Sequence, residues 1–220
     1  MNALSGPSAP PSAGGPPRQL IVLLHGVGAD GADLISLSQA MAGSLPHARF
    51  IAPNAPEPCD MAPMGYQWFS LSDRDPKRML EGVQRSAPLL NKFIDDELSK
   101  DGLYDRQLAL LGFSQGTMMS LYIAPRRAEA MAGVLGFSGA LLGGETLEAE
   151  AVSKPPMMLI HGDADPVVPI QALHGTVAGL QHAKIPVQWS VRPGLAHGID
   201  PAGIEAGAAF LKTAFEDRAA

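Results

Sequence analysis

The residues with the clearest chemical potential are a serine, two aspartates and a histidine, each placed just after an apolar run. Ser114 stands in Gly112–Gly116, which has the spacing Gly-x-Ser-x-Gly. Residues 108–111 before it are all apolar, and a helical pattern follows it as far as Pro125. This context predicts a serine on a sharp turn between a buried strand and a helix, where glycines on either side prevent collisions with neighbouring backbone.

An acidic residue and a histidine follow the serine, each in a loop after a predicted strand. Asp163 and Asp165 follow the apolar run at 157–160, and His197 follows the run at 187–191. A serine hydroxyl is a weak nucleophile until an imidazole takes its proton, and a carboxylate fixes the tautomer of that imidazole. The order Ser, Asp, His is the one expected of a nucleophile-elbow hydrolase. The residues alone do not decide between the two aspartates.

Three other patterns offer competing interpretations. Gly136-Phe137-Ser138 repeats part of the serine motif but lacks the second spaced glycine, so Ser138 is expected to be a strand end. The glycine-rich loop at 25–31 lacks the Lys and Ser/Thr of a nucleotide-binding loop, and we expect it to bring a backbone N–H close to Ser114. The Asp-x-Asp-x-Val pattern at 163–167 is similar to the haloacid dehalogenase class, but too little chain follows it for that class's other parts.

The remaining histidines and the single cysteine are expected to have ordinary roles. A metal site built from His25, His161 and the two aspartates lacks tight ligand spacing, so neither a metal nor a cofactor is predicted. His25 and His161 are expected to brace loops, whereas three others are expected to be solvated: His47, His174 and His182. Cys59 cannot form an internal disulfide, which favours a free thiol in a reducing, cytoplasmic setting.

These residues need a scaffold, and the chain alternates apolar runs with helical patterns. The predicted strands are 20–24, 49–52, 108–111, 134–137, 157–160 and 187–191, and the predicted helices are 32–42, 76–98, 115–124, 170–181 and 202–215. Alternation of this kind predicts an α/β fold with a mostly parallel central sheet and helices on both faces. Pro88 is expected to kink or break the longest helix. In such sheets, ligands bind beyond the carboxyl ends of the strands.

Composition limits the domain count and the partners. A chain of 220 residues, 46% hydrophobic and 17% charged, suits one domain, here 18–220. The net charge of −6 and the pI near 5.4 argue against binding to nucleic acid. No apolar run suggests an integral membrane segment. Residues 1–17 are rich in Pro, Gly, Ser and Ala and are predicted to be a disordered tail.

Taken together, the motifs resemble the phospholipase/carboxylesterase family of α/β-hydrolases, which includes bacterial carboxylesterases and acyl-protein thioesterases. The resemblance spans nearly all of the chain from Gln19 onward and rests on the segments Leu24–Gly31, Pro53–Pro56, Trp68–Phe69, Gly112–Gly116, His161–Pro169 and His197–Gly198. It implies the α/β-hydrolase fold and a serine hydrolase that needs neither metal nor cofactor.

The resemblance also implies individual roles. Ser114 would be the nucleophile, Asp165 rather than Asp163 the acid, and His197 the base. The oxyanion hole would come from the backbone N–H groups of Val27 and Gln115. The loop at 56–71 would lie over the site, and the implied acyl-binding residues are Met61, Met64, Trp68, Phe69 and Val167. Relatives often carry leucine or tyrosine in place of Val27, and glycine in place of Thr117.

The predicted activity is hydrolysis of small, short-acyl carboxylic esters through an acyl-enzyme intermediate. The alternative is a lysophospholipase or acyl-protein thioesterase that acts on longer acyl chains. A more distant alternative is a protein that keeps the fold only for binding, because a fold does not determine function. The resemblance further suggests a homodimer formed through apolar surface near the site.

Overall fold

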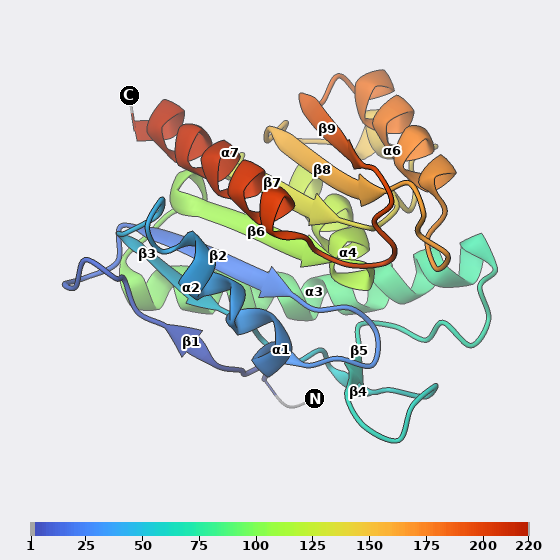
Figure 1. Cartoon of the computed structure of the whole chain (residues 1–220), viewed down its shortest axis with the longest axis horizontal. Helices are drawn as coiled ribbons and strands as arrows, with labels where there is room; N and C mark the ends of the chain where they lie inside the picture. The colour runs from blue at the N-terminus through green and yellow to red at the C-terminus, as the bar shows by residue number, and fades with distance from the viewer. Residues whose placement is uncertain (1–2, 220) are drawn as a thin grey trace.

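A seven-stranded sheet runs through the centre of the computed structural model, which describes residues 3–219 (Figure 1). The strand order is β1-β3-β2-β6-β7-β8-β9, and the pairs are parallel except for β1 with β3. The strands are β1 (Ser8–Ala9), β2 (Gln19–Leu24), β3 (Ala48–Ile51), β6 (Leu108–Phe113), β7 (Gly133–Phe137), β8 (Met157–Gly162) and β9 (Val187–Arg192), while β4 (Glu57–Pro58) and β5 (Tyr66–Gln67) form a separate pair. The mostly parallel sheet confirms the predicted fold class.

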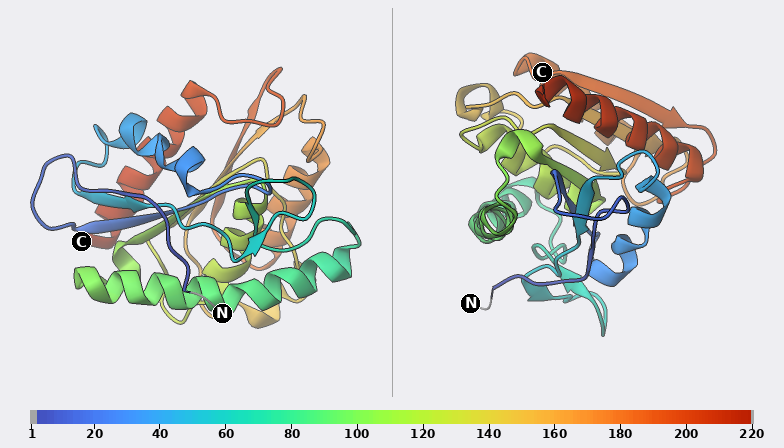
Figure 2. Two further views of the ribbon diagram at one scale, coloured as in Figure 1. Left: turned by 90° about the horizontal axis from the view of Figure 1, so that it is seen from below. Right: turned by 90° about the vertical axis from the view of Figure 1, so that its left-hand side faces the viewer.

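Helices cover both faces of this sheet, because its central strands are apolar on both sides. Along β2, Leu20 and Val22 belong to one buried cluster, whereas Ile21 and Leu23 belong to the other. Figure 2 shows α3 and α7 on opposite sides of the sheet. The first cluster includes residues of α3 (Pro76–Asp101), α4 (Gln115–Ile123), α5 (Leu147–Glu150) and α6 (Ile170–His182), and the second those of α1 (Gly31–Ile35), α2 (Leu37–Met41) and α7 (Pro201–Ala219).

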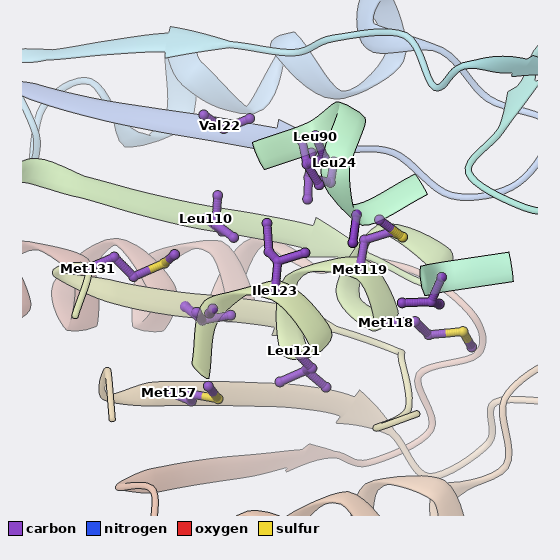
Figure 3. Close-up of a cluster of buried hydrophobic side chains, with 14 of the residues drawn as sticks. Val22, Leu24, Leu90, Leu110, Met118, Met119, Leu121, Ile123, Met131 and Met157 are labelled. Carbon is purple, nitrogen blue, oxygen red and sulfur yellow. The ribbon is translucent and has the colours of Figure 1, made fainter. Parts of the chain in front are cut away.

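The helix that follows Ser114 is buried on nearly all sides. Figure 3 shows Met119 and Ile123 of α4 in the same apolar cluster as Leu24 and Leu110 of the sheet. Each fully buried side chain of this size contributes roughly 1.5–3 kcal/mol relative to an exposed one. The helix ends where Pro125 enters a short 3₁₀ turn, η2 (Ala124–Arg126). Packing on several sides therefore holds the start of α4 in a fixed position.

Pro88 was expected to kink or break the longest helix. It does not break the helix, because α3 continues through Pro88 from Pro76 to Asp101. Pro88 is exposed, as is Gln84, whose carbonyl group loses its helical partner there and can be hydrated instead. The opposite side of the helix is held against the core by apolar residues, among them Val83 and Leu90.

The predicted disordered tail also needs correction for the residues that the structure describes. Ser8 of β1 pairs with Ile51 of β3, and the Ala52 N–H donates to the Pro7 carbonyl over 3.0 Å. Without this pairing, β3 would leave a row of backbone groups without partners at the edge of the sheet. Backbone pairing needs no apolar side chains, so composition does not reveal it. Residues 1–2 of the predicted tail lie outside the described range.

Within residues 3–219, no helix combines the length and the apolar character that crossing a membrane requires.

Candidate active site

Ser114 lies on the sharp turn between β6 and α4, as its motif predicted. Its φ is 53° and its ψ is −114°, a conformation that is costly for any residue with a side chain. The turn is held by flanking structure, because the Ser114 N–H donates to the Phe137 carbonyl over 2.9 Å. Ser114 is largely buried, with 6% of its surface exposed, yet it lines a cavity.

The two glycines of the motif are required by close backbone approach. A Cβ at Gly116 would lie 1.8 Å from the carbonyl oxygen of Leu24. At Gly112, it would lie 2.5 Å from the backbone nitrogen of Thr117. Real Cβ atoms do not approach other atoms so closely, so the spacing Gly-x-Ser-x-Gly follows from the packing of β6, α4 and β2 around the turn.

His197 and Asp165 form the closest charged contact at the site. The His197 Nδ1 lies 2.7 Å from Asp165 Oδ2. An ionised carboxylate only accepts hydrogen bonds, so Nδ1 carries the proton and donates it. This tautomer leaves Nε2 of a neutral imidazole with a free lone pair. The ring is also positioned by Phe113, with ring centroids 4.9 Å apart.

Asp165 is fixed by its own backbone contacts. Its Oδ1 accepts hydrogen bonds from the N–H groups of Val167 and Val168, over 2.8 and 2.9 Å. Burial by itself raises the pKa of the Asp165 carboxyl, but the hydrogen bonds from His197, Val168 and Val167 together hold that pKa below its ordinary value. The carboxylate therefore stays ionised at neutral pH and its second oxygen remains directed at His197.

Asp163 has a different partner from Asp165. Its Oδ1 accepts a hydrogen bond from the Gly194 N–H over 2.7 Å, which ties the loop after β8 to the loop that carries His197. His161 braces the same region, since its Nε2 lies 2.7 Å from the Val168 carbonyl and must donate to it. Both residues support the loops, and only Asp165 meets the imidazole of His197.

The loop at 25–31 lies against the serine turn. A Cβ at Gly26 would come within 3.3 Å of the Ser114 Cβ, and the next residue, Val27, lines the cavity. The buried ring of His25 holds this loop through both of its nitrogens. Its Nδ1 lies 2.7 Å from the Gly26 carbonyl oxygen, and its Nε2 accepts a hydrogen bond from the Ala55 N–H over 3.0 Å. Burial lowers the pKa of His25, which favours the neutral ring that this pair of contacts requires.

The side chain of Gln115 joins the serine turn to the loop at 56–71. Its Oε1 accepts from the Trp68 N–H over 2.8 Å, and its Nε2 donates to the Phe69 carbonyl over 2.6 Å. The backbone N–H of Gln115 stands at the start of α4, where N–H groups have no helical acceptor. The side chain of Gln115 thus anchors the neighbouring loop, and its backbone N–H directly follows Ser114 at the start of α4.

The serine turn and the base open into one cavity of about 390 Å³. Its lining consists of Gly26, Val27, Leu71, Arg74, Met79, Phe113, Ser114, Met118, Val167, Val168, Pro169 and His197. Apart from Ser114, His197 and Arg74, these residues present apolar side chains or backbone. The cavity lies beyond the carboxyl ends of the strands, where sheets of this type bind ligands.

Four of the five residues expected to bind the acyl group lie elsewhere. Trp68 and Phe69 are core residues with at most 1% of their surface exposed, and neither lines the cavity. Met61 and Met64 are exposed in the loop between β4 and β5 and are not among the residues that line the cavity. Only Val167 lies on the cavity wall. Trp68 and Phe69 are core residues because the Gln115 side chain holds their backbone and their rings belong to the main apolar cluster. A role for Met61 and Met64 in acyl binding stays a prediction.

Sequence reasoning missed four other residues that line the cavity. Leu71, Arg74 and Met79 come from the segment that leads into α3, and Met118 from the second turn of α4. The helical pattern assigned to 115–124 could have found Met118, because it lies one turn after Ser114. Nothing in the irregular segment around Arg74 indicated which side chains face the cavity.

Two alternative sites receive little support from the geometry. Ser138 directly follows β7, has a φ of 48° and is buried, and its hydroxyl has no hydrogen-bond partner in the described structure; it does not line the cavity. Among residues 3–219, no three His, Cys, Asp or Glu side chains are grouped so that they could hold a metal ion.

This fold, with a serine on a strained turn after a central strand, defines the class of protein: an α/β-hydrolase. Comparison with known proteins narrows the class. The family model described as phospholipase/carboxylesterase matches residues 11–215. The chain belongs to this family of serine hydrolases.

Individual relatives agree with this assignment. Acyl-protein thioesterase 1 of Kluyveromyces lactis is 32% identical over 168 residues, 71% of this chain and 73% of the relative. Acyl-protein thioesterase 1 of Saccharomyces cerevisiae is 30% identical over 216 residues, 90% and 93% of the two chains. Among solved structures, the esterase PE8 has a TM-score of 0.92 and 41% identity, covering 96% of this chain and 99% of that one.

Proposed function

We propose that the protein is a serine carboxylesterase whose catalytic residues are Ser114, His197 and Asp165. The observation that carries this proposal is the shared cavity, because Ser114 and His197 line it together and Asp165 holds His197 in the tautomer a general base needs. The family assignment supports hydrolysis of an acyl bond as the reaction.

In the proposed mechanism, the Ser114 hydroxyl attacks the acyl carbonyl while Nε2 of His197 takes its proton. Asp165 stabilises the imidazolium that forms. The N–H groups of Val27 and Gln115 bind the developing oxyanion, each contributing about 3–4 kcal/mol if they act like measured oxyanion-hole donors. The imidazolium then protonates the departing alcohol, which leaves an acyl-enzyme at Ser114. Water activated by His197 releases the acid and restores the enzyme.

We further propose short-acyl esters as the preferred substrates. The cavity, at about 390 Å³, lies near the lower end of the roughly 300–1,000 Å³ typical of small-molecule sites. Val167 and Met118 give it an apolar wall on which a short acyl chain would pack. The wall suits an acyl group and offers few hydrogen-bonding partners for a polar one.

The test is kcat/KM over p-nitrophenyl esters from acetate to laurate, with Ser114→Ala measured in parallel. We expect the rate to peak at short chains and to fall by about 10⁴-fold or more in the variant, as when a triad member is lost. His197→Ala should lose activity to a similar extent. If the Ser114→Ala variant, shown to be folded, kept the natural rate, the proposed nucleophile would be wrong.

A second candidate is hydrolysis of longer acyl thioesters on proteins. It is favoured by the names of the two yeast relatives, both acyl-protein thioesterases. The same Ser114 chemistry applies, with a thiol as leaving group. Comparing kcat/KM for butyryl and palmitoyl thioesters of one cysteine peptide separates the two candidates, since a preference for palmitoyl would select the thioesterase.

A further inference from the structure

Arg74 is the one permanently charged side chain among the residues that line the cavity. The remaining wall is apolar apart from Ser114 and His197, whose roles are already accounted for in the proposed mechanism. A guanidinium is always protonated, and because Arg74 is exposed, water solvates it in the free protein. An anionic group on a ligand in the cavity could replace that water.

The carboxylates nearest to Arg74 in the sequence are committed to other groups. Asp73 pairs with Arg78 over 3.0 Å and accepts the Asp75 N–H over 3.0 Å. Asp75 caps α3, where its Oδ1 accepts from the N–H groups of Lys77 and Arg78. Within the part of the chain that the structure describes, no salt bridge joins Arg74 to an acidic residue. Its charge remains available to a ligand.

The net negative charge of the protein makes a single arginine at the cavity stand out. With a net charge of −6, the molecule as a whole repels anions. A single arginine at the cavity offsets this locally. Leu71 and Met79 also line the cavity, so a ligand there meets both apolar side chains and a cation.

We propose that Arg74 forms a subsite for an anionic group on the ester substrate, so that the enzyme prefers esters carrying a carboxylate in addition to the scissile bond. This inference rests on the proposed function and specifies its substrate class. The guanidinium presents paired N–H donors that match a carboxylate, and hydrogen bonds between charged groups are about twice as strong as neutral ones. An ion pair made equally in the bound substrate and in the transition state lowers KM and leaves kcat unchanged, so we expect Arg74 to act mainly on KM.

The experiment compares esters that differ only in the anion. Mono-p-nitrophenyl adipate carries a carboxylate at the end of its acyl chain, and p-nitrophenyl hexanoate is its neutral counterpart. A second pair, 4-carboxyphenyl butyrate and 4-methylphenyl butyrate, places the anion on the leaving group. For each pair, the measured quantity is the ratio of kcat/KM for the anionic and the neutral ester.

We expect the ratio for one pair to fall about two- to fivefold in Arg74→Gln, the range that an exposed charge pair contributes, and further in Arg74→Glu. The pair that responds shows which side of the ester meets Arg74. High salt should lower the same ratio in the natural protein, because the arginine is exposed. The matched control is Lys77→Gln, which removes an equal charge nearby but outside the lining.

Three results would overturn the subsite: ratios that do not change in Arg74→Gln for either pair, an equal fall in Lys77→Gln, or a change in the ratio carried by kcat with KM constant. The neutral ester reports separately on the proposed function. If its hydrolysis depends on Ser114 while the ratios ignore Arg74, only the subsite is wrong. If no ester is hydrolysed in a Ser114-dependent way, the proposed function itself fails.

Discussion

At the scale of single residues, three histidines near the site differ because their partners fix different protonation patterns. His197 donates through Nδ1 to a carboxylate and keeps Nε2 free, which suits a base. His161 donates through Nε2 to a carbonyl, so that nitrogen has no lone pair to offer. His25 donates through Nδ1 and accepts through Nε2, which uses both ring nitrogens. Of the three, only His197 lines the cavity and keeps a ring nitrogen with a free lone pair there.

The neutral state of His25 leads to a prediction about stability and pH. Burial holds the pKa of His25 in the folded protein below its ordinary value of 6.5, so the unfolded chain binds the proton more readily. Well above pH 6.5, both states are neutral and His25 contributes no pH dependence. As the pH falls below that value, the unfolded state gains protons first, and the free energy of unfolding should decrease.

The measurement is urea unfolding between pH 7.5 and pH 5 for the natural protein and for His25→Asn, whose amide can both donate and accept. The natural protein should lose more stability than the variant over this range. Because the other titrating groups are common to both proteins, the difference isolates His25. Parallel curves would show that His25 titrates alike in both states.

Individual site residues differed in how far sequence could predict them. The order Ser114, Asp165, His197 was readable because each follows a strand, and strand ends of a parallel sheet meet at one edge. The geometry pairs Asp165 with His197, a choice that the residues alone left open. The residues that line the cavity were not predicted, because facing the cavity depends on tertiary contacts such as the one between Gln115 and the backbone of residues 68–69.

At the scale of elements, the β6–α4 turn is determined by how tightly three backbone segments meet. Gly116 illustrates the constraint, since an added Cβ would lie 1.8 Å from Leu24 O in β2. We expect Gly116→Ala to lower the free energy of unfolding by about 1–3 kcal/mol or more, because the backbone has to shift, and to lower esterase activity by displacing Ser114.

Gly175 in α6 provides the matched comparison. It also lies in a helix, but an added Cβ would have no atom within 4 Å, and the residue is exposed. Gly175→Ala should therefore raise the free energy of unfolding by about 0.5–1 kcal/mol, the usual gain for alanine in a helix interior. Urea unfolding of both variants checks the pair. The account of the turn would be contradicted if both substitutions shifted stability in the same direction.

The sequence predicted which strands and helices form better than it predicted where a helix is interrupted. The apolar runs identified the central strands β2, β6, β7 and β8, because strands buried on both faces are apolar nearly throughout. The edge strand β9 was also predicted, although polar residues interrupt it and none of its residues is fully buried. The single helix expected at 32–42 is divided at Ser36 into α1 and α2. Conversely, α3 passes through Pro88 because solvent can satisfy the carbonyl that proline frees. The division at Ser36 and the continuation through Pro88 both depend on which residues are exposed to solvent, and a local sequence pattern does not contain this information.

At the scale of the whole molecule, the N-terminal segment covers one side of the sheet next to β3, whereas β9 forms the other edge. The edge at β9 pairs only with β8 within the described chain, whereas β3 is covered by residues from the N-terminal segment. Leu4 of that segment packs against the main apolar cluster, and two of its carbonyl groups accept hydrogen bonds from Ala52 and Asn54. The segment therefore completes the sheet at the β3 edge, opposite the edge formed by β9.

Deletion of residues 1–17 should consequently destabilise the entire domain. It removes the β1 pairing and the Leu4 contact, and a loss of about 2 kcal/mol would lower Tm by roughly 4–8 °C for a chain of this size. It also exposes the edge of β3, so light scattering should detect more self-association. The single substitution Gly6→Ala tests the same contact without shortening the chain. The added Cβ would lie 1.9 Å from Ala52 O, so we expect the substitution to detach the segment from β3. Differential scanning calorimetry of both proteins decides the matter: unchanged Tm values would mean that the segment contributes nothing to the fold and behaves as the disordered tail that its composition suggested.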